Sequence, residues 1–304
     1  MKNNQLMIYG AYGYAGELMV REAVAQGLRP IIAGRDDEKL KPIATELSLE
    51  CRAFGVRNTG SNLQDISVLL NCAGPFSATA EPLARACLAQ QIHYLDITGE
   101  IDIFRKCHAL DEEARQQNVL ILPGAGTDIV PTDCLAAMLK EKLPAATRID
   151  LALSFGTNPS IGTVNTMIES FGKGGLIREG GMLKVVSNAF QMRKIPFQNK
   201  PQWAMTIPWG DVFTSGISTG VPDGAVYMAM PRMSIYMIRL TNPVKGILNT
   251  QFGQKITKRL AGWLMKKGPD AKALEAGRGQ FWGEAEAPDG EKLEMTMSTP
   301  NVYA

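Results

Sequence analysis

The chain has 304 residues and a net charge of +2, which gives no bulk attraction to nucleic acid. It has only two histidines, and its five scattered cysteines contain no Cys-x-x-Cys pair, so the sequence favours neither a metal site nor a disulfide framework. No apolar signal-peptide core occurs near the N-terminus, and the most apolar stretch, residues 228–248, is interrupted by prolines and basic residues, so we expect a cytoplasmic protein.

The first half of the chain alternates short apolar runs with amphipathic patterns, which is typical of a parallel sheet covered by helices. The predicted strands are residues 6–9, 30–33, 67–72, 92–95 and 119–122, and the predicted helices are residues 14–26, 38–47, 81–90 and 101–117. This order predicts an α/β Rossmann domain over residues 1–144, with a doubly wound parallel sheet of about six strands.

The second half, residues 145–304, is richer in Gly, Pro, Thr and Met. Residues 284–297 have the pattern of a hairpin with Asp289-Gly290 at its turn. We predict an α+β domain that forms the substrate wall and the surface for a homodimer. The methionines Met228, Met230, Met233 and Met237 suit a core, a dimer contact or a lipid-like substrate.

A glycine-rich loop lies between the first predicted strand and the first predicted helix. Gly10, Gly13 and Gly16 stand at its first, fourth and seventh positions, where a dinucleotide-binding loop needs a tight turn, close approach to a pyrophosphate and helix packing. The remaining predicted cofactor contacts of this loop are Tyr12, Tyr14 and Ala15. The alternative is a glycine-rich turn that binds no ligand.

The end of the second strand distinguishes NADP from NAD. Gly34 leaves space there, and the Arg35 guanidinium can pair with a 2′-phosphate, so we predict NADP. Two alternatives remain open: Asp36 or Asp37 reaches a free ribose hydroxyl, or Arg35 only forms a surface ion pair with Asp36 or Glu38.

These motifs resemble those of the saccharopine-dehydrogenase-like family, which includes trans-acting enoyl reductases. Besides residues 10–16 and 32–36, the resemblance rests on residues 71–76, 81–87, 93–100, 128–133, 208–211 and 218–222. It implies a Rossmann domain, a nicotinamide cofactor that is usually NADP, and a second domain that closes over the nicotinamide. It implies no single substrate.

This sequence departs from the family pattern at three places. Tyr12 and Ala15 stand where the family usually has threonines, and Thr127 and Ile129 replace the more common Phe and Ser. The sequence stops at Ala304, where relatives continue into a helix, so we expect the second domain to lack that helix.

Three loops follow predicted strands, where ligands cross a doubly wound sheet. The first, Gly74, Pro75 and Phe76, is a predicted cofactor contact, or a rigid turn with Phe76 in the core. The second provides Thr98 and Gly99 as cofactor contacts and Glu100 as a catalytic candidate, with helix capping as the alternative.

The third loop, residues 124–128, contains Asp128, our main catalytic candidate, although Asp128 or Thr127 alternatively caps the following helix. Asp96, just before the second loop, is a candidate proton relay.

The sequence has no Tyr-x-x-x-Lys pair, no Gly-x-Ser-x-Gly elbow and no Walker loop. We therefore predict NADP-dependent hydride transfer to or from a small or lipid-like metabolite. The alternative is a sensor or scaffold that binds NADP(H) without turnover. Residues 255–267, from Lys255 to Lys267, form a basic amphipathic pattern that either docks on the protein or contacts an anionic membrane.

Overall fold

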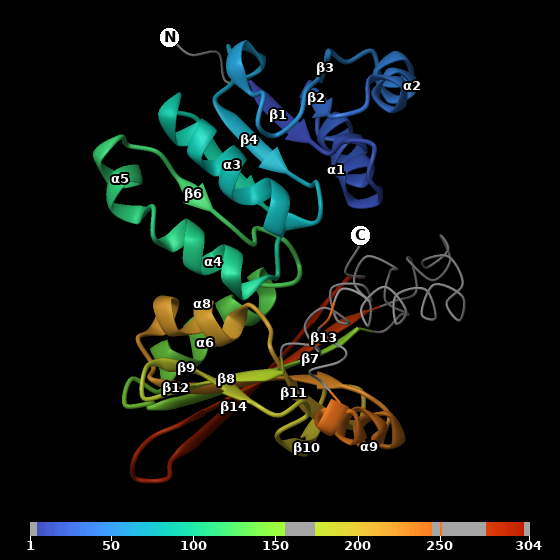
Figure 1. Ribbon diagram of the computed structural model, residues 1–304. Helices are drawn as coiled ribbons and strands as arrows, with labels where there is room; N and C mark the ends of the chain where they lie inside the picture. The colour runs from blue at the N-terminus through green and yellow to red at the C-terminus, as the bar shows by residue number, and fades with distance from the viewer. Residues whose placement is uncertain (1–4, 156–173, 245–249, 251–277, 301–304) are drawn as a thin grey trace. The chain divides into compact units, whose positions relative to one another are not determined.

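A computed structural model describes residues 5–155, 174–244, 250 and 278–300 (Figure 1). It divides the chain into two compact units, residues 1–128 and 129–304. We predicted the boundary near residue 144. The structure places it earlier because helix α6 (Val130–Lys142) packs against strands of the second unit.

The first unit is built on a six-stranded parallel sheet in the order β3-β2-β1-β4-β5-β6, which confirms the Rossmann prediction. Its strands are β1 (Leu6–Tyr9), β2 (Ile31–Gly34), β3 (Cys51–Ala53), β4 (Val68–Asn71), β5 (His93–Asp96) and β6 (Ile121–Leu122). Its helices are α1 (Tyr14–Ala25), α2 (Asp37–Leu47), η1 (Gly60–Leu63), α3 (Phe76–Ala89), α4 (Ile101–His108) and α5 (Asp111–Gln116).

Side chains of β1 alternate between the two faces of this sheet and belong to two separate hydrophobic clusters. Met7 and Tyr9 pack with residues of β4, α3 and α4, whereas Ile8 packs with residues of β2, α1 and α2. Because both faces are covered by helices, β1 is almost entirely apolar rather than alternating in polarity.

Three local predictions for the first unit were wrong. Strand β3 was not predicted, because it has only three residues and one of them is Arg52. Helix α3 begins at Phe76 rather than at residue 81, and it contains Pro82, a residue that ordinarily favours the first helical turn. The single helix predicted over residues 101–117 is two helices, with a break at Ala109 and Leu110.

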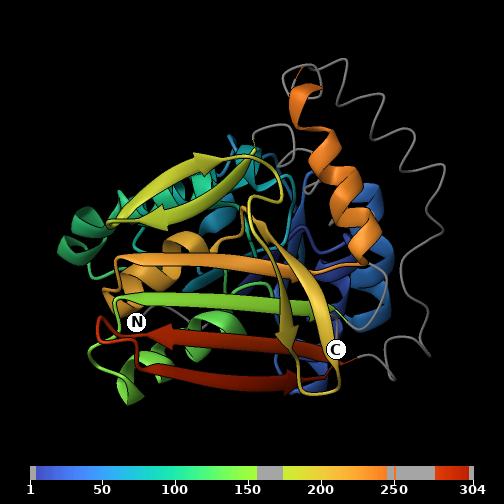
Figure 2. The ribbon, with the colours of Figure 1, turned by 90° about the horizontal axis from the view of Figure 1, so that it is seen from below.

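The second unit contains an eight-stranded sheet with the main order β10-β11-β12-β7-β13-β14 (Figure 2). Its strands are β7 (Arg148–Phe155), β8 (Gly175–Glu179), β9 (Met182–Val186), β10 (Met192–Pro196), β11 (Pro201–Ile207), β12 (Asp223–Ala229), β13 (Gly279–Glu286) and β14 (Lys292–Thr299). In the described part of this unit the helices, besides α6, are α8 (Asp211–Thr219), α9 (Arg232–Leu240) and η2 (Asn242–Val244).

Two features of this sheet match the α+β prediction. Strands β7 and β12 are parallel, whereas the other pairs are antiparallel. Strands β13 and β14 form the predicted hairpin, and Gly290 at its turn has a φ of +89°.

The four methionines do not share one environment. Met228 is buried in β12 and Met230 is half-buried, whereas Met233 and Met237 on α9 are exposed. The predicted basic pattern from Lys255 to Lys267 lies outside the described residues. No helix in the described ranges is both long and apolar enough to cross a bilayer.

Candidate functional site

The loop between β1 and α1 requires glycine at its first position. Gly10 has a φ of +86°, and a Cβ there would lie 2.7 Å from the backbone nitrogen of Ala73. Any side chain at this position would therefore be strained in its backbone and would collide with the chain that follows β4. The structure thus brings the loop against the carboxyl end of β4.

Gly13 and Gly16 complete the turn into α1. The Gly13 amide donates to the Gly10 carbonyl at 2.9 Å, and a Cβ on Gly16 would lie only 2.2 Å from that carbonyl oxygen. Gly13 occupies the N-cap position of α1 and has no side chain to cap the helix. A helix start of this kind presents backbone N–H groups and the positive end of the helix dipole to an anion.

Tyr12 extends from the glycine loop to the end of β2. A Cβ on Gly34 would lie 2.6 Å from Cε1 of Tyr12, so the aromatic ring occupies the space that Gly34 leaves free. The Lys39 ammonium lies 5.6 Å from the centre of the same ring. These residues and the adjacent Arg35 lie at the end of β2, a region that we call the β2 end; Lys39 there also pairs with Asp36 at 3.4 Å.

The two carboxylates that could oppose an anion at the β2 end have other partners. Asp36 is the N-cap of α2, where its side chain accepts a hydrogen bond from the Lys39 amide at 3.3 Å, and Asp37 pairs with Lys41 at 2.8 Å. Arg35 is exposed and forms no hydrogen bond or ion pair with any described residue. Neither Asp36 nor Glu38 pairs with it, so the ion-pair alternative for Arg35 is wrong.

The loop after β4 places two predicted contacts at the surface. Gly74 and Pro75 are exposed, and the peptide bond between them is cis. Phe76 is half-buried and packs against the hydrophobic cluster on the α3 face of the sheet. Phe76 is therefore at least in part a core residue, as one alternative proposed.

Asp96, the candidate proton relay, is completely buried at the end of β5. Its Oδ1 accepts hydrogen bonds from the amides of Thr98 at 3.0 Å and Gly124 at 2.8 Å, and its Oδ2 accepts one from the Tyr94 hydroxyl at 2.8 Å. Burial raises the pKa of Asp96, and these three hydrogen bonds oppose that rise. The carboxylate is bonded to protein groups and is not presented to a ligand.

Thr98, Gly99 and Glu100 form the turn between β5 and α4. Thr98 is buried, and its hydroxyl accepts a hydrogen bond from the Glu100 amide at 3.1 Å. Glu100 is half-buried and occupies the N-cap position of α4, but its side chain makes no capping hydrogen bond. The Thr98 hydroxyl therefore stabilises the turn that precedes the helix.

Asp128 is the last residue of the first unit, and it is half-buried. Burial raises the pKa of its carboxyl to about 6. Helix α6 begins at Val130 with Ile129 in the N-cap position, so neither Thr127 nor Asp128 occupies the capping position. A carboxyl with such a pKa can hold and release a proton near neutral pH.

Comparison with known proteins shows what this chain is similar to. Residues 6–122 match the family model described as the saccharopine dehydrogenase NADP binding domain. A rat protein named saccharopine dehydrogenase-like oxidoreductase is 25% identical over 231 residues, which cover 66% of this chain and 53% of the rat protein. Residues 6–122 of this chain are therefore similar to the NADP binding domain of saccharopine dehydrogenase, and the chain is similar to proteins named saccharopine dehydrogenase-like oxidoreductase.

A second relative extends the comparison. A Caenorhabditis elegans protein named lipid droplet localized protein is 24% identical over 225 residues, which are 64% of this chain and 53% of that protein. This chain thus spans about half the length of the curated relatives that it matches.

A solved structure supports the fold of this chain. It is the apo saccharopine dehydrogenase (L-Glu forming) of Saccharomyces cerevisiae, which aligns with a TM-score of 0.63 at 9% identity. The alignment covers 98% of this chain and 85% of the yeast chain. It therefore confirms the two-part architecture, a Rossmann domain with a second mixed sheet.

The sequence alone did not indicate several side chains at the carboxyl ends of the strands of the Rossmann domain. Lys39 lies on α2 with its ammonium near the Tyr12 ring, a contact that the sequence does not indicate. Asn71 and Thr79 are linked to Tyr94 and Asp96 through hydrogen bonds that join β4, α3 and β5, and no local motif marks such links.

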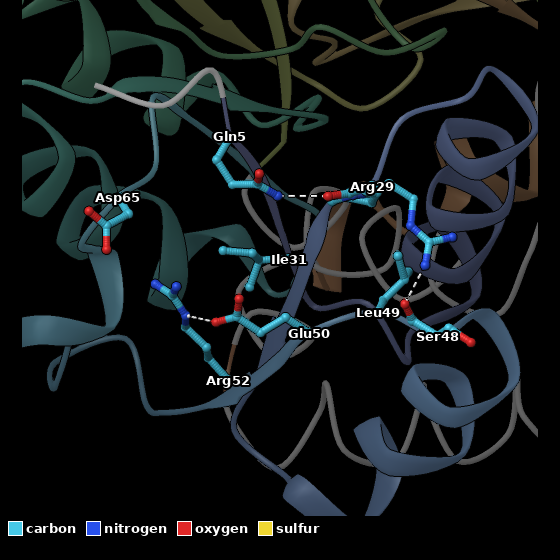
Figure 3. Close-up of a pocket in the computed structure, with 9 residues that line it drawn as sticks. Gln5, Arg29, Ile31, Ser48, Leu49, Glu50, Arg52 and Asp65 are labelled. Atoms are coloured by element: carbon cyan, nitrogen blue, oxygen red, sulfur yellow. Dashed lines mark hydrogen bonds and ion pairs between the residues drawn. The ribbon is translucent and has the colours of Figure 1, made fainter. Parts of the chain in front are cut away.

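A pocket of about 380 Å³ lies at the opposite edge of the same sheet (Figure 3). It is lined by residues that precede β1, β2 and β3, among them Gln5, Arg29 and Glu50. The Gln5 side chain donates to the Arg29 carbonyl at 2.6 Å, and Arg52 pairs with Glu50 at 2.7 Å. None of the predicted site residues lines this pocket, and the side chains of Gln5, Arg29 and Arg52 donate hydrogen bonds to backbone carbonyls.

Proposed function

We propose that this chain is an NADP-dependent oxidoreductase that transfers a hydride to or from a small or lipid-like metabolite. The observation that carries the proposal is the glycine loop, in which Cβ atoms at Gly10 and Gly16 would lie within 3 Å of backbone atoms. Such a loop, directly after β1 and opening an uncapped helix, fits a dinucleotide diphosphate.

The preference for NADP is supported at the β2 end. Arg35 is free of ion pairs among the described residues, and Lys39 lies on the next turn of chain beside Tyr12. Asp36 and Asp37, which in an NAD site would accept from a ribose hydroxyl, are bound to α2 and to its lysines. A 2′-phosphate therefore meets two cations, and the nearest carboxylates are already partly neutralised.

The chain's own residues have three tasks in this reaction. The start of α1 neutralises the diphosphate, and the loops after β4, β5 and β6 hold the nicotinamide half and exclude water. Asp128 holds or releases the proton that accompanies reduction, since its pKa of about 6 suits either role. The bound nicotinamide supplies or accepts the hydride.

Titration calorimetry of NADPH against NADH tests the cofactor assignment. We expect NADPH to bind more tightly, and Arg35→Ala to lose about 1–3 kcal/mol of that preference, the scale of a hydrogen bond to a charged group. Arg115→Ala is the matched control, because it removes one exposed cation from α5 in the same unit. The control should leave the preference unchanged, and equal wild-type affinities for the two cofactors would refute the NADP assignment.

A substrate panel separates turnover from binding alone. Steady oxidation of NADPH with any ketone, imine or enoyl thioester would support the oxidoreductase. Tight NADPH binding without hydride loss across the whole panel would instead favour a sensor or scaffold that binds NADP(H) without turnover.

A further inference from the structure

A continuous series of side-chain hydrogen bonds runs beneath the carboxyl ends of β4 and β5. The Asn71 side chain donates to the Thr79 hydroxyl at 3.2 Å and to the Tyr94 hydroxyl at 3.1 Å. Tyr94 in turn donates to Asp96 at 2.8 Å. Asn71, Tyr94 and Asp96 are all buried, so these bonds are shielded from water. We call these four side chains the buried relay.

One end of the buried relay fixes the loops that follow β5 and β6. Asp96 accepts from the amides of Thr98 and Gly124 through its carboxylate, and its backbone carbonyl accepts from the Ala125 amide at 2.7 Å. An ionised carboxylate has only acceptors, so it suits a position faced by three donors. Asp96 therefore fixes the positions of the loops that follow β5 and β6.

The other end fixes the loop that follows β4. The Asn71 side-chain oxygen accepts from the Ala73 amide at 3.0 Å, and the Thr79 hydroxyl donates to the Ala73 carbonyl at 2.6 Å. Ala73 is the residue whose backbone nitrogen would be 2.7 Å from a Cβ at Gly10. The buried relay therefore connects all three loops and reaches the backbone that borders the glycine loop.

We propose that Asp96 is the positioning residue for the nicotinamide half of the cofactor and does not transfer a proton. Through the buried relay it holds the loops at residues 73–76, 98–100 and 124–126 at the edge where that half binds. This inference rests on the proposed function, because it takes the loops after β4, β5 and β6 as the nicotinamide end. It replaces the proton-relay role predicted for Asp96, since the side chain is completely buried and both oxygens have protein partners.

A residue that only stabilised the fold would affect the two halves of the cofactor equally. The adenosine half is expected at the β2 end and the start of α1, whose contacts do not include the Asp96 carboxylate. Adenosine 2′,5′-bisphosphate carries the 2′-phosphate but no nicotinamide, so its affinity reports that half alone. The ratio of NADPH affinity to 2′,5′-bisphosphate affinity isolates the contribution of the nicotinamide half.

The experiment measures both dissociation constants by calorimetry for wild type, Asp96→Ala and Asp96→Asn. For Asp96→Ala we expect the Kd of NADPH to rise about tenfold and the Kd of the bisphosphate to change less than about twofold, the scale of one or two lost hydrogen bonds. Asp96→Asn keeps an oxygen for the loop amides but brings a second donor toward the Tyr94 hydroxyl. Its Kd for NADPH should therefore lie between those of wild type and Asp96→Ala. This variant also keeps the test usable if the alanine variant does not fold.

Two further variants sharpen the comparison. Tyr94→Phe removes the hydroxyl between Asn71 and Asp96 but leaves both loop amides bonded, so we expect a smaller change of the same kind. Leu88→Ala is the matched control. Leu88 is buried near the C-terminal end of α3, whereas the Gly74 loop precedes the N-terminal end of that helix. The Leu88→Ala substitution should lower the midpoint of thermal unfolding without changing the affinity ratio.

The outcomes separate the inference from the function on which it rests. The positioning role would be overturned if Asp96→Ala weakened the binding of NADPH and of the bisphosphate by the same factor. Such an equal loss would reflect only a smaller fraction of folded protein. If wild type binds neither NADPH nor the bisphosphate, the proposed function itself fails. A raised NADPH Kd with an unchanged bisphosphate Kd supports both.

Discussion

At the scale of single residues, the glycine loop is the part of the site that tolerates change least. A Cβ on Gly16 would lie 2.2 Å from the Gly10 carbonyl oxygen, which is a backbone atom and cannot rotate away. We therefore predict that Gly16→Ala abolishes measurable NADPH binding and lowers the free energy of unfolding by about 1–3 kcal/mol, as overpacking does.

Equilibrium denaturation with and without NADPH checks this prediction. Gly55→Ala is the control, because no atom lies within 4 Å of a Cβ there and its φ is not in the left-handed region. It should leave stability nearly unchanged. A Gly16→Ala protein that is as stable as wild type and still binds NADPH would contradict the geometry of the loop.

Asp128 gives a prediction about pH at the same scale. Burial raises its pKa from the ordinary 3.8 to about 6, so folding disfavours the ionised form. The stability of wild type is therefore greatest when Asp128 is protonated and declines as pH rises from about 4 to about 6. Asp128→Asn removes the charge, so the variant should exceed wild type by about 1–3 kcal/mol above pH 6, a range reduced because the side chain keeps some exposure.

Chemical denaturation at pH 4.5 and pH 8 tests this linkage. The advantage of Asp128→Asn should be smaller at pH 4.5 than at pH 8. An Asp128→Asn advantage of the same size at both pH values would show that the carboxyl is not held in a desolvated site.

At the scale of elements, local patterns predicted the strands of the first unit well because each buried strand is a short apolar run. The first strand was predicted with the bounds of β1, and β2 and β5 differ by one residue at each end. The three-residue β3 was not predicted, because such a short segment with an arginine has almost no apolar pattern.

In the candidate site, too, local motifs could be predicted from the sequence, whereas contacts between distant residues could not. The glycine loop and Arg35 are local motifs and were predictable, whereas the buried relay joins side chains of α3, β4 and β5 through contacts 8 to 23 residues apart in sequence. Helix capping also needs the structure, because Thr98, Glu100 and Asp128 all stand near helix starts in the sequence. Only the coordinates show that the Thr98 side chain stabilises the turn before α4 and that Ile129 is the N-cap of α6.

The start of α2 provides a prediction for one element. Asp36 caps this helix, so Asp36→Ala should destabilise it by about 1 kcal/mol and at the same time remove a negative charge beside Arg35. We expect a lower midpoint of thermal unfolding together with an unchanged or tighter affinity for adenosine 2′,5′-bisphosphate. A weaker affinity would indicate that Asp36 contributes to the adenosine half directly.

At the scale of the whole molecule, the two units have separate sheets and separate optical signals. All four tryptophans, Trp203, Trp209, Trp263 and Trp282, belong to the second unit, and the proposed cofactor loop belongs to the first. Tryptophan fluorescence therefore follows the second unit, while binding of the adenosine 2′,5′-bisphosphate reports the first.

A substitution in the second unit can use this separation. A Cβ on Gly224 would lie 2.5 Å from the Ile149 carbonyl and 3.1 Å from Nη2 of Arg178, a buried guanidinium that also donates to the carbonyls of Val212 and Val221. We predict that Gly224→Ala lowers the midpoint of the tryptophan transition by several degrees, on the order of a 1–3 kcal/mol loss. The bisphosphate affinity at 20 °C should remain within about twofold of wild type, because its contacts lie in a unit with its own core. A parallel loss of bisphosphate binding well below the tryptophan transition would mean instead that the first unit holds its cofactor edge only when the second is intact.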